Sequence, residues 1–191
     1  EAGCGVDCSS ATELMIADKL GFRNDEIMFS SNGTPEGEFK YCNELGGIIN
    51  LDDITMIDYM EAECGIPETV SCRYNPGGVF EVCNGIMDNP GDAKYGMTPE
   101  QIVEAFKILK AKGVKNFGIH AFLASNTVTN DITQCLQEQF LNLQLNLKKK
   151  QEQTLSSLIY QVELESLIHL IRHQMTLWLL EKEYTKFMMK F

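Results

Sequence analysis

Short apolar runs alternate with amphipathic stretches along the first 130 residues. Five runs rich in β-branched and aromatic residues lie at residues 5–8, 26–31, 46–51, 69–75 and 116–122, with helical patterns between them. The first four runs begin about every 21 residues, the spacing that a strand, a loop, a helix and a return loop require. This alternation predicts an α/β fold with a parallel sheet, either a (β/α) barrel or a doubly wound sheet.

Two helix starts carry a capping signature. Residues 10–13 (Ser-Ala-Thr-Glu) and 98–101 (Thr-Pro-Glu-Gln) both fit the capping box, and the second has proline at the first helical position. Five βα units are too few for a closed eight-stranded barrel, which takes ~250 residues. If the fold is a barrel, residues 1–130 therefore hold about half of it, a partial (β/α) TIM-type barrel of about five units.

The composition changes abruptly near residue 130. All 15 Gly and all 5 Pro precede it, so residues 131–191 contain neither. The first part has 9 basic and 20 acidic residues, a net charge of −11, whereas the tail has 7 of each and a net charge of zero. The abundant Leu, Gln, Lys and Glu of residues 131–191 favour helix. We treat these residues as a separate, helix-prone tail.

Charge and cysteine usage exclude several functions. The acidic net charge of −11, with one basic run at residues 148–150, argues against nucleic-acid binding. No run approaches the ~18 apolar residues of a membrane span. The 7 cysteines form neither a zinc-binding pattern nor an even set, so reduced thiols, no metal site and a cytoplasmic protein are expected.

The carboxyl ends of the predicted strands are where an α/β protein places its working residues. Four motifs there and nearby are informative: GVDCSSATEL at 5–14, SCRYNPG at 71–77, DAKYG at 92–96 and FGIHAFLASN at 117–126. Together, and in this order, they resemble the group III pyridoxal-phosphate decarboxylases with an alanine-racemase-like barrel. The diaminopimelate decarboxylases are the most similar members.

The resemblance implies a pyridoxal 5′-phosphate enzyme that converts meso-diaminopimelate to L-lysine and CO2, and a homodimer in the cytoplasm with no nucleic-acid or membrane partner. An ornithine, arginine or carboxynorspermidine decarboxylase of the same fold is the alternative within this class. From another class, a non-catalytic helical interaction protein remains open, with residues 131–191 as its partner-binding segment.

Carried over by position, Asp7 and Glu13 match family acids beside the cofactor and its lysine. Arg73 matches an arginine near the ring hydroxyl, and Ser125 matches a phosphate-binding serine. Three of these residues also have a structural interpretation: Glu13 as a capping-box partner, Arg73 as a surface cation and Ser125 as a loop hydroxyl.

The chain departs from the family pattern at the residue that stacks on the pyridine ring. Phe122 stands where the family has histidine, so stacking is retained but proton transfer from that position is not. His120, two residues earlier on the same strand face, is the candidate substitute. Its structural interpretation is a hydrogen-bonded histidine at a strand end.

The family's cofactor lysine is also missing. It belongs to a strand that precedes Gly5, in a Tyr-Ala-x-Lys-Ala-Asn-like segment that this sequence does not contain. We therefore expect an N-terminally truncated fragment that does not retain the cofactor and is inactive alone.

The tail is compatible with a shifted reading frame. If one base was lost after the codon for Asp131, residues 159–168 (IYQVELESLI) permit Asn-Leu-Ser-Gly-Gly-Val-Gly-Ile-Pro-Tyr, which is the glycine-rich loop that the family has next. Residues 132–158 permit YYPMFARAIFELAVELKKETGADIKFI, and residues 169–184 permit SPDKTPNDIMAIGEGV. We interpret residues 131–191 as an out-of-frame translation.

Overall fold

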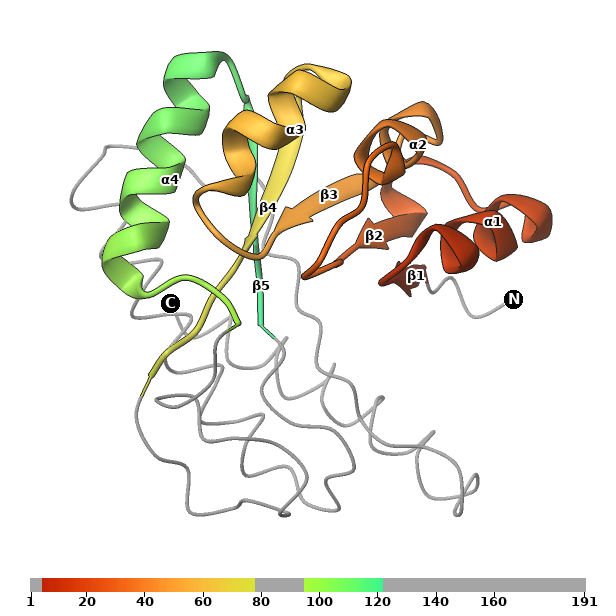
Figure 1. Ribbon diagram of the computed structural model, residues 1–191, viewed down its shortest axis with the longest axis horizontal. Coiled ribbons are helices and arrows are strands. Elements are labelled where there is room, and N and C mark those ends of the chain that lie inside the picture. Colours follow the sequence, from red (N-terminus) through yellow and green to blue (C-terminus); the bar gives the residue numbers. More distant parts are fainter. Residues whose placement is uncertain (1–4, 78–94, 122–191) are drawn as a thin grey trace, which may run out of the picture.

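The computed structural model describes residues 5–77 and 95–121, which form five strands and four α-helices (Figure 1). Along the chain these are β1 (Val6–Cys8), α1 (Ala11–Leu20), the 3-10 helix η1 (Asn24–Glu26), β2 (Ile27–Phe29), α2 (Glu38–Glu44), β3 (Ile48–Leu51), α3 (Met56–Cys64), β4 (Thr69–Arg73), α4 (Pro99–Lys112) and β5 (Asn116–His120). Every strand falls inside one of the five predicted runs. The tail from residue 131 lies outside the described residues.

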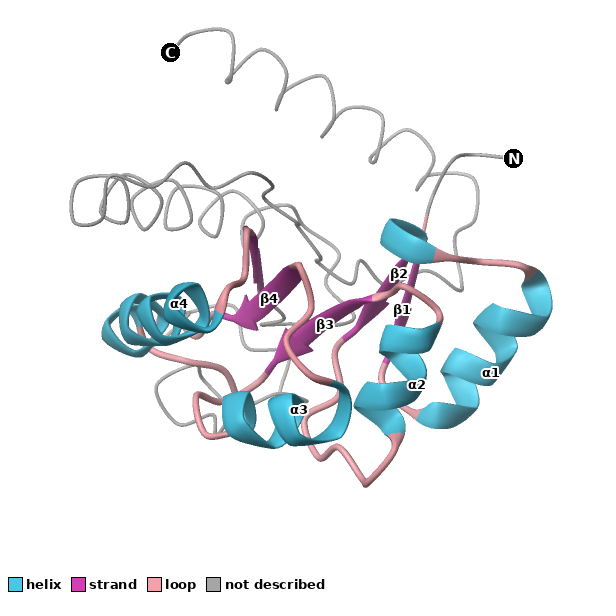
Figure 2. Ribbon diagram, turned by 90° about the horizontal axis from the view of Figure 1, so that it is seen from above, coloured by secondary structure: helices cyan, strands magenta, loops and turns pink. Residues whose placement is uncertain are grey.

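The sheet is parallel throughout and its strands follow chain order, β1-β2-β3-β4-β5. Figure 2 shows the helices in an arc around one side of the sheet. A doubly wound sheet reverses its strand order part-way and carries helices on both faces, whereas a (β/α) barrel adds each strand beside the last. The predicted α/β fold and partial barrel are therefore confirmed, and strand order decides between the two architectures.

The helix-facing side of the sheet is apolar. Phe29 on β2 meets Phe39 of α2 edge to face, with ring centroids 6.1 Å apart, and Phe117 on β5 lies 4.9 Å from Phe106 of α4. Leu51 and Cys72, paired across β3 and β4, share this buried face. Since side chains alternate along a strand, the intervening residues form the opposite, inner face.

Both predicted helix starts are capped by their hydroxyl residues. Thr98 and Gln101 form the full reciprocal capping box, with Pro99 at the first helical position. At α1, Ser10 Oγ accepts from the Glu13 N–H at 3.4 Å. A full capping box would have the Glu13 carboxylate accept from the N–H of the N-cap residue, Ser10. Instead it accepts from the Ser9 N–H at 2.5 Å, one residue earlier.

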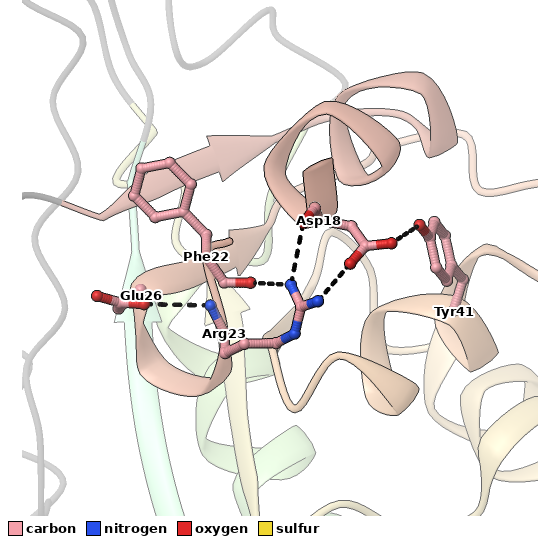
Figure 3. Close-up of polar contacts among 5 residues, drawn as sticks. All are labelled: Asp18, Phe22, Arg23, Glu26 and Tyr41. Atoms are coloured by element: carbon pink, nitrogen blue, oxygen red, sulfur yellow. Dashed lines mark hydrogen bonds and ion pairs between the residues drawn. The ribbon is translucent and has the colours of Figure 1, made fainter. Parts of the chain in front are cut away.

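A polar network closes the connection from α1 to β2 (Figure 3). Asp18 of α1 pairs with Arg23 Nη2 at 2.5 Å and accepts from the Tyr41 hydroxyl of α2 at 3.1 Å. The Arg23 N–H donates to Glu26 at 3.1 Å, which holds η1 against the same corner. Exposed pairs of this kind contribute ~0–1 kcal/mol each, so their effect is mainly to fix the loop's path.

Within residues 5–77 and 95–121, no helix has the length and apolar character needed to cross a bilayer. The same residues contain no cluster of three or more His, Cys, Asp or Glu side chains placed to hold a metal ion. Cys8, Cys42, Cys64 and Cys72 are free thiols.

Candidate functional site: the inner face of strands β3 to β5

Polar side chains line the inner face of three neighbouring strands. Asn50 pairs in register with Ser71, and Arg73 pairs with His120. Asn50 and Ser71 are fully buried, and Arg73 and His120 are 6% and 2% exposed. Because paired residues in a parallel sheet point to the same side, these four side chains share one face. The carboxyl ends of β3, β4 and β5 therefore form a buried polar surface opposite the helices.

Arg73 is held by a buried carboxylate. Its Nη1 lies 2.8 Å from Oδ1 of Asp52, the first residue after β3, and the side chains are 7% and 8% exposed. Burial raises the pKa of Asp52, and the neighbouring Arg73 charge acts in the opposite direction. The Tyr95 ring centroid lies 5.1 Å from the guanidinium carbon, within the range of a cation–π contact. The structural interpretation of Arg73 as a surface cation is therefore wrong.

A short segment, residues 95–97, docks beside the end of β4. Tyr74 and Met97 form a parallel bridge, the Met97 N–H donates to the Arg73 carbonyl at 2.7 Å, and the Asn75 side chain donates to the Tyr95 carbonyl at 2.9 Å. This docking brings the Tyr95 ring and the Gly96 N–H to the Arg73–Asp52 pair.

Glycine is required at residue 96 for two reasons. Its φ is +84°, and a Cβ there would lie 3.2 Å from the Asn75 backbone nitrogen and 3.3 Å from Arg73 Cγ. We expect Gly96→Ala to lower the free energy of unfolding by about 2–4 kcal/mol, as measured in urea. Gly21→Ala is the matched control, because Gly21 has φ +87° but no neighbour within 4 Å. Equal losses in the two variants would show that crowding at Gly96 has no energetic effect.

His120 is buried and neutral. Its Nδ1 lies 3.5 Å from the Asn50 side-chain nitrogen, and burial, with a smaller contribution from Arg73, lowers its pKa to about 4. His120 Nε2, Asn50 Oδ1 and Ser71 Oγ are buried with no hydrogen-bond partner among the described residues. Buried polar atoms normally have partners, so this face is suited to a polar group. At neutral pH His120 can therefore donate or accept a hydrogen bond, but its imidazole is not protonated to the cation.

The lowered pKa of His120 predicts a pH-dependent stability. The unfolded chain binds a proton near pH 6.5 and the folded chain near pH 4, so stability is complete above pH 6.5 and falls as the pH drops between those values. We expect about 3 kcal/mol to be lost over this window. Chemical denaturation at several pH values measures it, and His120→Gln should flatten the slope. An unchanged slope in that variant would assign the effect to another group.

The two predicted acids lie near the β1 edge of the sheet. Asp7, half-buried on β1, accepts from the Ser30 hydroxyl at 2.7 Å. Glu13 is exposed, and Ser9 donates to its carboxylate through both the backbone N–H and the hydroxyl. In strand order, β2 and β3 separate Asp7 from Arg73. The catalytic roles of Asp7 and Glu13 stay predictions, as do the cofactor-binding roles of Phe122 and Ser125, which lie outside the described residues.

Sequence reasoning missed Asp52 and Tyr95. Asp52 directly follows the buried strand β3, and an acidic residue at the carboxyl end of an apolar run is the sequence feature that could have identified it. Tyr95 lies in the DAKYG motif, but nothing in the sequence shows that this motif folds back onto β4. Asn50 lies near the end of the predicted run 46–51 and Ser71 opens the SCRYNPG motif, but neither residue was singled out, since polar residues inside short strands are common on solvated faces.

The comparisons with known proteins identify the family. A family model described as "pyridoxal-dependent decarboxylase, pyridoxal binding domain" matches residues 1–150. The chain belongs to the pyridoxal-dependent decarboxylases. The predicted resemblance to pyridoxal-phosphate decarboxylases is confirmed, and pyridoxal is the cofactor of this family.

Curated relatives of this decarboxylase chain agree. Protein TabA of Pseudomonas amygdali pv. tabaci is 33% identical over 127 residues, covering 66% of this chain and 29% of the relative. Diaminopimelate decarboxylase of Thermoplasma acidophilum is 28% identical over 122 residues, covering 64% of this chain and 30% of the relative. The chain thus spans about 30% of the length of these relatives.

Solved structures of decarboxylases share the fold. A diaminopimelate decarboxylase crystal structure superposes with a TM-score of 0.68 at 18% identity, covering 82% of this chain and 37% of that one. The diaminopimelate decarboxylase from M. jannaschii, in complex with L-lysine, gives a TM-score of 0.64 at 24% identity, covering 85% of this chain and 38% of that one. These identities establish the architecture and not the substrate.

Proposed function

We propose that the complete protein is a pyridoxal 5′-phosphate decarboxylase that releases CO2 from meso-diaminopimelate and yields L-lysine. The family match over residues 1–150 carries the proposal. Five curated relatives bear the name diaminopimelate decarboxylase, which favours this substrate over ornithine, arginine or carboxynorspermidine. As the resemblance implies, we propose a cytoplasmic homodimer.

The residues of the inner face fit the cofactor. Arg73 supplies a buried, fixed positive charge that would face the ring hydroxyl, an oxygen that is readily ionised. Asn50, Ser71 and His120 have polar atoms without a partner among the described residues, and these atoms give the same face both donor and acceptor capacity. Asp7 would lie beside the cofactor, and Ser125 would hold the phosphate.

Pyridoxal phosphate, when bound, supplies a ring that accepts the electrons left behind by the departing carboxylate. Arg73 keeps positive charge beside the ring oxygen, where negative charge is stabilised. Neutral His120 can donate one hydrogen bond from the floor of the site without adding charge. Phe122 would cover the ring with an apolar face.

The test is a substrate assay on a protein that spans the full length of the relatives. The purified protein, supplied with pyridoxal phosphate, is given meso-diaminopimelate, ornithine, arginine or carboxynorspermidine at equal concentration. We expect CO2 and lysine from diaminopimelate, with kcat/KM at least ~100-fold above the others because polar substrate groups are strongly discriminated. Preference for another of the four substrates would change the substrate assignment. Release of no CO2 from any of them would refute the proposed decarboxylase activity.

A further inference from the structure

Asp52 has no role in the proposed chemistry, yet it is among the most constrained carboxylates described. It follows β3 directly and is 6% exposed. Both of its oxygens are engaged: Oδ1 lies 2.8 Å from Arg73 Nη1, and Oδ2 accepts from the Gly96 N–H at 3.4 Å. The carboxylate is thus anchored to the backbone on one side and directed at the guanidinium on the other.

This arrangement restricts a long side chain. Arginine loses much rotamer freedom when it is fixed, and a guanidinium buried without a counter-charge is strongly unfavourable. Asp52 provides the counter-charge from β3, and the Tyr95 ring, at 5.1 Å, provides a second contact from the docked segment. Neither residue is adjacent to Arg73 in the chain, so the guanidinium is oriented by tertiary structure.

We infer that Asp52 is a positioning residue, which holds the Arg73 guanidinium at the inner face so that it meets the ionised ring hydroxyl of a pyridoxal phosphate. The Gly96 N–H fixes the carboxylate, and the Tyr95 ring limits where the guanidinium can turn. The identity of the ligand rests on the proposed function. The Asp52–Arg73 geometry does not.

A positioning role differs measurably from a purely structural ion pair. If Asp52 only stabilises the fold, its loss weakens every ligand of the site alike. If it aims Arg73 at the ring hydroxyl, its loss weakens only ligands that carry that hydroxyl. Pyridoxamine 5′-phosphate and its 3-deoxy analogue differ in this group alone, and neither needs a protein lysine to bind.

The experiment measures the Kd of both ligands by calorimetry on the complete, cofactor-free protein. We expect Asp52→Asn to weaken pyridoxamine phosphate about 10-fold, the scale of one displaced charged hydrogen bond, and to change the 3-deoxy analogue less than ~2-fold. Arg73→Met should show the same selectivity, and the double variant should lose no more than Arg73→Met alone.

Asp53→Asn is the matched control. Asp53 is the neighbouring carboxylate, but it accepts from the backbone N–H and hydroxyl of Thr55 and not from Arg73. Both ligands should bind this variant as they bind the unsubstituted protein. Asp52→Glu keeps the charge and shifts it by one methylene. It should weaken pyridoxamine phosphate by less than Asp52→Asn does and leave the 3-deoxy analogue unchanged, and it replaces Asp52→Asn in the experiment if that variant does not fold.

Equal weakening of both ligands by Asp52→Asn, or of neither, would overturn the inference. The decarboxylation assay is separate from these Kd values. A protein that releases no CO2 but shows the hydroxyl-selective loss refutes the proposed function and leaves the positioning role intact. Active enzyme with no selective loss refutes the positioning role alone.

Discussion

Inserting one base after the codon for Asp131 is expected to convert a tail without Gly or Pro into the helix, strand and Ser-Gly-Gly-Val-Gly loop that the shifted frame permits. Backbone N–H groups of such a loop can bind a phosphate. In a protein that also carries the family's lysine strand and the remaining length of its relatives, the repaired frame should give pyridoxal phosphate binding and CO2 release. The unrepaired frame should give neither.

Sequencing the DNA around codons 130–133 is the direct measurement. A two-base deletion at the same point is an independent control, because it restores the same downstream frame with one codon fewer and should behave alike. The family match continues past Asp131 and ends at residue 150. If the DNA shows residues 132–191 in their proper frame, the frameshift proposal is refuted and the helical interaction segment takes its place.

Arg73→Ala in the complete protein is expected to lower kcat by ~10²–10³-fold, the usual cost of removing one charged group that stabilises developing negative charge. Cofactor retention should change less, because the phosphate is proposed to bind at Ser125 and not at Arg73. Steady-state kinetics and the amount of pyridoxal phosphate retained after dialysis separate the two effects.

The substitution also leaves Asp52 buried without its counter-charge, which costs about 3–5 kcal/mol. Arg73→Lys guards against mistaking unfolding for lost chemistry, since it keeps the positive charge but not the planar donor group. It should fold and show an intermediate kcat. Arg23→Ala is the control for removing an arginine, because Arg23 is exposed and pairs only at the α1 corner among the contacts described. A kcat for Arg73→Ala within ~3-fold of the unsubstituted protein would exclude the assigned role.

The strands could be predicted because each apolar run is short and bounded by turn residues. Thr98 and Gln101 likewise carry a local signal, and the structure contains their capping box. No local sequence feature distinguishes a barrel from a doubly wound sheet, because the two differ in strand order, and strand order depends on the edge of the sheet to which each new strand is added.

The candidate site was only partly accessible to sequence reasoning. Arg73 was found through a motif, but its partner Asp52 lies 21 residues away, directly after another strand, and Tyr95 is brought close by the backbone bridge between residues 74 and 97. The Glu13 prediction shows the opposite problem. The same acid at the start of a helix is expected both for a local cap and for a catalytic role. The observed contacts from Ser9 to Glu13 agree with a local structural role and do not test the catalytic one.

The chain-order sheet has a consequence for how the protein is made. Each strand pairs with the one synthesised just before it, from β1 through β5. Each later strand joins the sheet through a helical crossover from the strand before it, and N-terminal parts emerge first from the ribosome. The units can therefore assemble one after another during translation. Arg73 meets Asp52 as soon as β4 joins β3, but the Gly96 and Tyr95 contacts wait for the segment before α4, so the site is completed late in the synthesis of this region.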